Sequence, residues 1–182
     1  MQVFIFSMRI ASILLNRAFY ASLILVSMVL NVSAQVAEDE EPEERHHCLY
    51  EEKSISIGAG ASYSLPLDLV GINVRSYYNL NEKICLGPEF SFFKSPDVQV
   101  LEFNAIAHYV IETPVVGISP IAGLNYTSEE LVNETEEGFG VAFGLGVHRN
   151  FDKMTLFTEY ISVVGAVPDN FINVGVFFSF EL

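Results

Sequence analysis

The residues best suited to chemistry are a few acids, two histidines and one arginine that stand on one face of alternating segments. Paired carboxylates and imidazoles can relay protons or hold a metal, and they can also form a buried ion network. Charges removed from bulk water need partners, so the role of these residues depends on the environment that their segments create. The set comprises Arg75, Glu89, Glu102, His108, Glu112, His148, Glu159 and Glu181.

Eight segments alternate apolar residues with small or polar ones, which is the period of a β-strand. The last segment, 172–182, is apolar at every even position, and its length matches the roughly 9 to 11 residues that a tilted strand needs to cross a bilayer. Pro88 predicts a bulge in the third segment, because proline cannot donate to a ladder. The segments are 54–65, 70–79, 84–93, 100–112, 116–126, 138–148, 154–163 and 172–182.

The composition of the polar face favours a membrane barrel over a soluble carrier. A soluble eight-stranded carrier would turn its apolar face inward and cover its outside with charged residues. Here the polar face is mostly Gly, Ser, Asn and Ala, and the apolar face is broad and aromatic, as a lipid-facing surface would be. We therefore predict an all-β, eight-stranded antiparallel up-and-down transmembrane β-barrel over residues 53–182, with a lipocalin-like secreted carrier as the alternative.

In such a barrel the acids, histidines and arginine point into the lumen. If the second hairpin centres on Glu82, Arg75 lies directly opposite Glu89 and forms a charge-assisted pair with it. Acids outnumber bases in this set, so some carboxylates must be hydrated, protonated or near a mouth. We expect a structural polar network that fills the lumen, with a proton or ion path as the alternative, and we predict no metal or cofactor.

Catalysis on lipids would need a serine, a histidine and a carboxylate that meet on the outer face near one rim. His108 and His148 are expected to point inward, while His46 and His47 precede the barrel. No histidine is then left for the outer rim. The sequence therefore predicts a protein without enzymatic activity.

The chain begins with two apolar runs split by Arg17, and they end in the small residues Val32-Ser33-Ala34. This pattern predicts a cleaved signal peptide over residues 1–34, with translation from Met1 or Met8 and an uncleaved anchor helix as the alternative. Residues 35–52 contain a block of acids with a proline, which predicts a disordered periplasmic arm. His46-His47-Cys48 in this arm resembles a metal-binding cluster, but its spacing matches no standard zinc pattern.

The two cysteines are predicted to lie at the same end of the barrel. Cys48 precedes the first segment and Cys85 opens the third. The periplasm is oxidising, so we expect a disulfide that ties the arm to the barrel rim, with two free thiols as the alternative.

The longest gap between segments, residues 128–137, is predicted to be an outer loop. The acids of this loop are expected to be solvated. The alternative is that they bind calcium or magnesium together with lipopolysaccharide phosphates. The formal charge of −14 argues against nucleic acid as a partner. The acids of this gap are Glu129, Glu130, Glu134, Glu136 and Glu137.

Three stretches resemble strands of the outer-membrane protein β-barrel domain family, the PorT-like and OmpX-like small barrels. The fourth strand of that family has a proline and a lysine where Asn104 and His108 stand here. The resemblance implies an integral outer-membrane protein of a Gram-negative bacterium without shared catalytic residues. The stretches are Leu101-Glu102-Phe103 with Ala105 to Tyr109, Ser119-Pro120-Ile121-Ala122-Gly123, and Gly138-Phe139-Gly140 with Gly144-Leu145-Gly146-Val147.

Three functions are compatible with these observations. The first is a structural or surface-interaction barrel that meets outer-membrane lipid and lipopolysaccharide and needs the barrel-insertion machinery for its biogenesis. The second is an accessory barrel of a protein secretion or transport complex, since some members of the family serve secretion and the acidic arm could dock a periplasmic partner. The third is a lipid-modifying enzyme. The first is the function that we predict.

Overall fold

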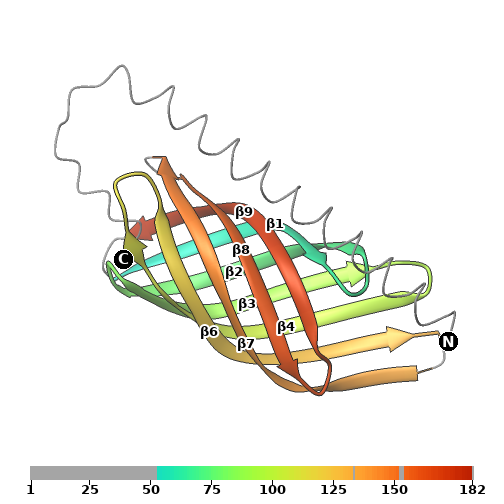
Figure 1. The fold of residues 1–182 in the computed structure, drawn as a ribbon. Coiled ribbons are helices and arrows are strands. Elements are labelled where there is room, and N and C mark those ends of the chain that lie inside the picture. Colours follow the sequence, from blue (N-terminus) through green and yellow to red (C-terminus); the bar gives the residue numbers. More distant parts are fainter. Residues whose placement is uncertain (1–52, 133, 152–153, 182) are drawn as a thin grey trace, which may run out of the picture. The chain divides into compact units, whose positions relative to one another are not determined.

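The structure is a computed structural model that describes residues 53–132, 134–151 and 154–181. These residues form a single antiparallel sheet (Figure 1). No helix in this part of the chain is long and apolar enough to cross a membrane. The strands are β1 (Ser54–Ser64), β2 (Leu69–Asn81), β3 (Ile84–Lys94), β4 (Val98–Tyr109), β5 (Ile111–Glu112), β6 (Gly117–Leu131), β7 (Glu134–Phe151), β8 (Met154–Gly165) and β9 (Asp169–Glu181).

The sheet closes into a barrel because β1 also pairs with β9. Strands β4 and β5 act as one strand, since both pair with β6 and only Val110 separates them. The N–H group of Val110 donates instead to the carbonyl oxygen of Lys83 (2.6 Å). Counted this way, the barrel is the eight-stranded up-and-down meander that the sequence predicts, and its closure pairs the backbone groups internally, as a bilayer requires.

The pleat places the two faces as predicted. Val74, Phe90 and Phe178 on the apolar face are 48%, 38% and 46% exposed. Arg75 and Glu89 on the other face are 3% and 1% exposed. The apolar face is therefore the outside of the barrel, and the alternative of a soluble carrier with an apolar interior is wrong.

The two rims of the barrel differ in what they carry. The terminal rim holds the first residue of β1 and the last of β9, where Ser54 pairs with Glu181. The distal rim carries the β1–β2, β3–β4, β6–β7 and β8–β9 connections. Strands β6 and β7 have the longest run of paired residues in the sheet. Their register continues without a break to the pair Leu131–Glu134.

This register corrects the prediction of an outer loop over residues 128–137. Strand β6 continues to Leu131 and β7 begins at Glu134, so the five glutamates of this segment belong to paired strands. The apolar alternation ends before it, but polar alternation supports strand pairing just as well outside a membrane, which is why the sequence pattern placed the strand ends too early. We call residues 128–137 the acidic hairpin.

The predicted bulge at Pro88 is also wrong. The pairs Arg75–Glu89 and Tyr78–Leu86 on its two sides share one register, and Pro88 itself pairs with Ala105 of β4. The register shift between β2 and β3 instead lies at Asn79 and Asn81, next to the turn. A missing N–H group therefore interrupts the ladder without inserting a residue.

Candidate functional site

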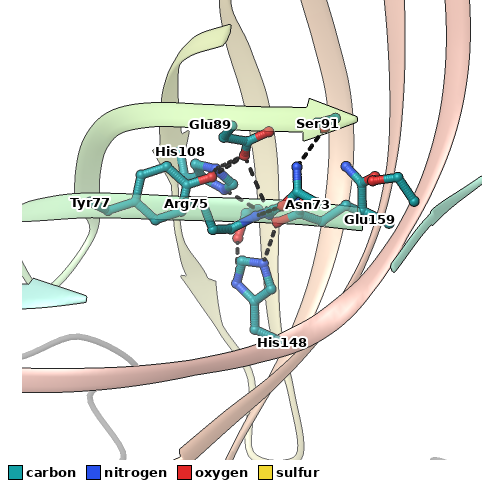
Figure 2. Close-up of polar contacts among 11 residues, drawn as sticks. Asn73, Arg75, Tyr77, Glu89, Ser91, His108, His148 and Glu159 are labelled. Atoms are coloured by element: carbon teal, nitrogen blue, oxygen red, sulfur yellow. Dashed lines mark hydrogen bonds and ion pairs between the residues drawn. The ribbon is translucent and has the colours of Figure 1, made fainter. Parts of the chain in front are cut away.

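The centre of the lumen holds a buried ion network around Arg75 of β2. Its Nη1 atom lies 2.5 Å from Oε2 of Glu159 in β8 and 3.3 Å from Oε1 of Glu89 in β3. Its Nε atom donates to Oδ1 of Asn73 (2.6 Å), and Asn73 in turn donates to Oγ of Ser91 (2.7 Å). Figure 2 shows these side chains converging from separate strands. The guanidinium thus links the two walls of the barrel through charge-assisted bonds.

The first histidine joins this network through a tyrosine. Nε2 of His108 lies 3.1 Å from the hydroxyl of Tyr77 and 3.9 Å from Oε1 of Glu89. The Tyr77 hydroxyl donates to that same carboxylate oxygen. Tyr77 and Arg75 therefore both contact Oε1 of Glu89 and hold this carboxylate between them (Figure 2).

The second histidine joins the network from β7. Nδ1 of His148 lies 3.0 Å from Oγ of Ser119 in β6, and Nε2 lies 3.3 Å from Oε1 of Glu159. Serine, histidine and carboxylate in this order resemble a hydrolytic triad. All three side chains are at most 2% exposed, so a lipid substrate has no approach to the serine. We call Arg75, Tyr77, Glu89, His108, His148 and Glu159 the lumen cluster.

Aromatic rings pack against the lumen cluster. The guanidinium carbon of Arg75 lies 4.2 Å from the ring centre of Phe157 and 5.6 Å from that of Phe177, within cation–π range. Glycines in the wall make room for these rings. A Cβ at Gly58 would lie 2.5 Å from the Phe177 ring, and one at Gly175 would lie 2.6 Å from the Phe157 ring.

A second polar layer lies in the lumen beside the cluster. Glu102 of β4 accepts a hydrogen bond from Oγ1 of Thr127 (3.1 Å), and Thr127 is 2.9 Å from Oδ1 of Asn125. Asn125 donates to Asn104 (2.8 Å). Glu102 is 1% exposed, so this layer buries a further glutamate in addition to Glu89 and Glu159.

The structure brings six of the eight predicted lumen residues into the interior. Arg75 and Glu89 pair across the hairpin, as the register arithmetic predicts. Glu112 and Glu181 are exposed instead. Both stand at strand ends on the terminal rim, where the inward direction of a side chain no longer leads into a closed lumen.

Several residues of this site are not among those predicted from the sequence. Tyr77, Ser119 and Asn73 are uncharged, but they occupy the same inward register as the charges, and that shared register is the signal that could have found them. The short Arg75–Glu159 contact could not be found in this way. Strands β2 and β8 are not neighbours in the sheet, and hairpin arithmetic gives only neighbouring pairs.

Other predicted sites lie partly outside the described residues. Cys85 is buried on the inward face of β3, but Cys48 lies outside the described range, so the disulfide remains a prediction. The same applies to the signal peptide and to the acidic arm with His46 and His47. The five glutamates of the acidic hairpin are described, and they line the extension of β6 and β7.

Two acids at the distal rim have shifted pKa values. Burial raises the pKa of Asp169 to about 6, although the N–H group of Asn170 (2.5 Å) and the hydroxyl of Ser64 (2.9 Å) both donate to it and oppose the shift. Burial, and then the facing carboxylate of Glu136, raise the pKa of Glu129. Both acids therefore prefer to be protonated in the folded barrel more than in the unfolded chain.

The closed antiparallel barrel has an apolar exterior, and its interior combines buried ions and polar groups with aromatic and aliphatic side chains, which is the architecture of a transmembrane β-barrel. No protein-family model matches the chain, and no curated protein matches it. Among solved structures, the N-terminal β-barrel domain of Pseudomonas aeruginosa OprF is 18% identical, with a TM-score of 0.61 over 71% of this chain and 98% of that one.

The attachment invasion locus protein Ail of Yersinia pestis gives similar matches. Its complex with the heparin analogue sucrose octasulfate is 17% identical, with a TM-score of 0.55 over 71% of this chain and 99% of that one. Its structure in a phospholipid bilayer nanodisc is 17% identical, with a TM-score of 0.51 over 71% and 100% of the two chains. The fold is therefore that of the small outer-membrane β-barrels.

Proposed function

We propose that the protein is an integral barrel of the outer membrane with a structural or surface-interaction role, whose lumen is closed by its own side chains and performs no catalysis. The observation that carries this proposal is the burial of the lumen cluster: Arg75, Glu159 and His148 are 3%, 2% and 0% exposed. An eight-stranded barrel has an interior only wide enough for side chains to fill.

Closure of the lumen rests on contacts that cross it. Arg75 of β2 binds Glu159 of β8. Two phenylalanine rings pack on Arg75, Phe157 from β8 and Phe177 from β9. A path through the lumen would have to separate a buried ion pair, and uncompensated buried charges cost about 3–5 kcal/mol. This cost favours a closed lumen over the alternative of an ion path.

Solute flux tests the closed lumen. The mature protein, reconstituted into liposomes, is compared with protein-free liposomes and with liposomes that contain a general porin. We expect swelling in arabinose at the rate of the protein-free sample. Swelling close to that of the porin sample would show an open channel and overturn the proposal.

The surface role is assigned to the acidic hairpin. Glu129 lies opposite Glu136, and the other three glutamates stand on the same two paired strands, so the hairpin concentrates carboxylates at the distal rim. Such a surface suits divalent cations shared with lipopolysaccharide phosphates. Binding of lipopolysaccharide to the detergent-solubilised protein is expected to fall when Mg²⁺ is chelated and when all five glutamates are replaced by glutamine. Binding that is unchanged in both cases would remove this role.

Similarity to the PorT-like and OmpX-like barrels is a finer part of this proposal. The alternative function is an accessory barrel of a protein secretion or transport complex that docks a periplasmic partner through residues 35–52. Crosslinked partners of the full mature chain are compared with those of a chain that lacks residues 35–47. A partner that is lost with the arm supports a role in a complex. An identical set of partners would contradict docking through the arm.

A further inference from the structure

We propose that the lumen contains a binding site for one divalent transition-metal ion of the zinc class, formed by His108, His148 and Glu159. One ligand atom from each residue lies within 4.8 Å of the other two, and all three residues are buried. Two imidazoles and one carboxylate form the ligand set of zinc and ferrous sites that keep an open position. The site is not predictable from sequence spacing, because its three ligands come from β4, β7 and β8.

The distances between the ligand atoms approach those of a metal site. Nε2 of His148 lies 3.3 Å from Oε1 of Glu159, and Nδ1 of His108 lies 4.0 Å from the same oxygen. Atoms bound at about 2.1 Å to a tetrahedral zinc ion lie about 3.4 Å apart. The first pair already meets this distance, while the second pair and the two imidazole nitrogens, which lie within 4.8 Å of each other, must move closer together on binding.

An unsatisfied nitrogen points to a missing ligand. Nδ1 of His108, like Nη2 of Arg75 and Oε2 of Glu89 in the same cluster, is buried without a hydrogen-bond partner among the described residues. Buried polar atoms in folded proteins are almost always paired, with protein, water or an ion. A metal ion between His108 and Glu159 would supply the partner that the protein itself does not offer.

The surrounding residues hold both imidazoles in the orientation that a metal needs. With the metal at Nδ1 of His108, Nε2 donates to Tyr77 (3.1 Å), and Tyr77 donates to Glu89. With the metal at Nε2 of His148, Nδ1 donates to Ser119 (3.0 Å). Support of the second imidazole nitrogen is a regular feature of metal sites, since it fixes the tautomer and the ring. Figure 2 shows both rings close to Glu159.

Glu159 has one oxygen for each of its two tasks. Its Oε2 atom binds Arg75 at 2.5 Å, so Oε1 remains for the two histidines. Gly146 lets the His148 ring lie close to the barrel wall, because a Cβ there would be 2.9 Å from its Nε2 atom.

Metal content of the folded protein tests the site. The full mature chain, carrying no polyhistidine tag, is folded in detergent with zinc sulfate, passed through a desalting column and analysed by mass spectrometry for zinc. We expect one zinc per chain. The His46→Ala/His47→Ala variant is the matched control, because it removes the only other histidines of the chain, and it should keep its zinc.

Variants of the ligands and of their support separate metal binding from folding. His148→Gln is expected to lose the zinc and also the visible absorption bands of a cobalt-substituted sample. Ser119→Ala leaves all three ligands in place and is expected to weaken zinc binding about 10- to 100-fold, with an unchanged melting temperature of the metal-free protein. If His148→Gln does not fold, the zinc affinity of the Ser119→Ala variant alone tests the site.

Three results would overturn the site. The first is zinc at the level of the buffer blank in the folded wild-type protein. The second is zinc that is retained in folded His148→Gln but lost from the His46→Ala/His47→Ala control. The third is a zinc affinity in Ser119→Ala equal to that of the wild type.

Discussion

The lumen cluster and the acidic hairpin contain the same kind of charged side chain in opposite environments. In the lumen, Glu89 and Glu159 are at most 2% exposed, and Arg75 binds both. In the hairpin, Glu129 faces Glu136 across a strand pair, although like charges directly opposite each other destabilise a sheet.

The difference shows where the barrel tolerates mismatched charge. Outside the apolar surface, water and ions screen the repulsion between carboxylates, so the hairpin can keep an acidic surface at little cost. Inside, no screening is available, and each charge needs a fixed partner. Charge in the lumen therefore determines stability, and charge in the hairpin is free to serve a surface role.

Removal of the central cation should have the largest effect. Arg75→Met leaves Glu89 and Glu159 buried without a counter-charge, so we expect a loss of about 3–5 kcal/mol in the free energy of unfolding. Urea unfolding in lipid vesicles measures this loss. Lys94→Met is the matched control, because Lys94 is exposed at the end of β3. Equal stability of the two variants would mean that the lumen does not depend on its ion pair.

Overpacking of the wall should have the next largest effect. Gly58→Ala adds a Cβ that would lie 2.5 Å from the ring of Phe177, and forced repacking of this kind costs about 1–3 kcal/mol. Ala59→Val changes the neighbouring residue, which is exposed on the outer face, and should leave the urea midpoint nearly unchanged. A larger effect of Ala59→Val than of Gly58→Ala would contradict the assignment of the two faces.

The distal rim should show a pH-dependent stability. The pKa of Asp169 is about 6 in the folded barrel and about 3.9 in an unfolded chain. Its contribution is therefore fully present below about pH 4 and is lost as the pH rises through about 6. We expect the Asp169→Asn variant to gain stability relative to the wild type between pH 4 and pH 7.

Melting temperatures at four pH values in this window check the effect of Asp169. Asp68→Asn serves as a control, because Asp68 is an exposed acid at the same rim. A difference between Asp169→Asn and the wild type that is constant with pH would contradict the raised pKa.

Relief of repulsion in the acidic hairpin should have the smallest effect. Glu129→Gln removes one of two carboxylates that face each other, and we expect a gain of about 0.2–1 kcal/mol at low salt. The gain should shrink as salt is added. Urea unfolding at two salt concentrations measures it, and a loss of stability at low salt would show that Glu129 has a favourable partner.

The sequence was sufficient for the fold because the strand period is visible in every segment. Alternation such as that of 172–182 assigns each residue to a face, and one correct hairpin centre at Glu82 placed Arg75 opposite Glu89. The ends of β6 and β7 were missed, since the apolar signal stops at the membrane while strand pairing continues.

Contacts across the lumen were beyond the sequence for a geometric reason. Which side chain of β8 reaches Arg75 depends on the tilt and stagger of the whole barrel, and no local pattern records these. The aromatic filling was visible as Tyr77, Phe157 and Phe177 at inward positions. The share of the lumen that these rings fill was underestimated. The glycines around them were interpreted as lumen filling, whereas a Cβ at Gly58 or Gly175 would collide with a ring.

The orientation of the pleat is the central claim, and single tryptophans test it most directly, because the chain contains none. Phe178 is 46% exposed on the outside, and its neighbour Phe177 is fully buried in the lumen. In vesicles of brominated lipid, the fluorescence of the Phe178→Trp variant should be strongly quenched, and that of Phe177→Trp should be nearly unaffected. Strong quenching of Phe177→Trp with an unquenched Phe178→Trp would contradict the account.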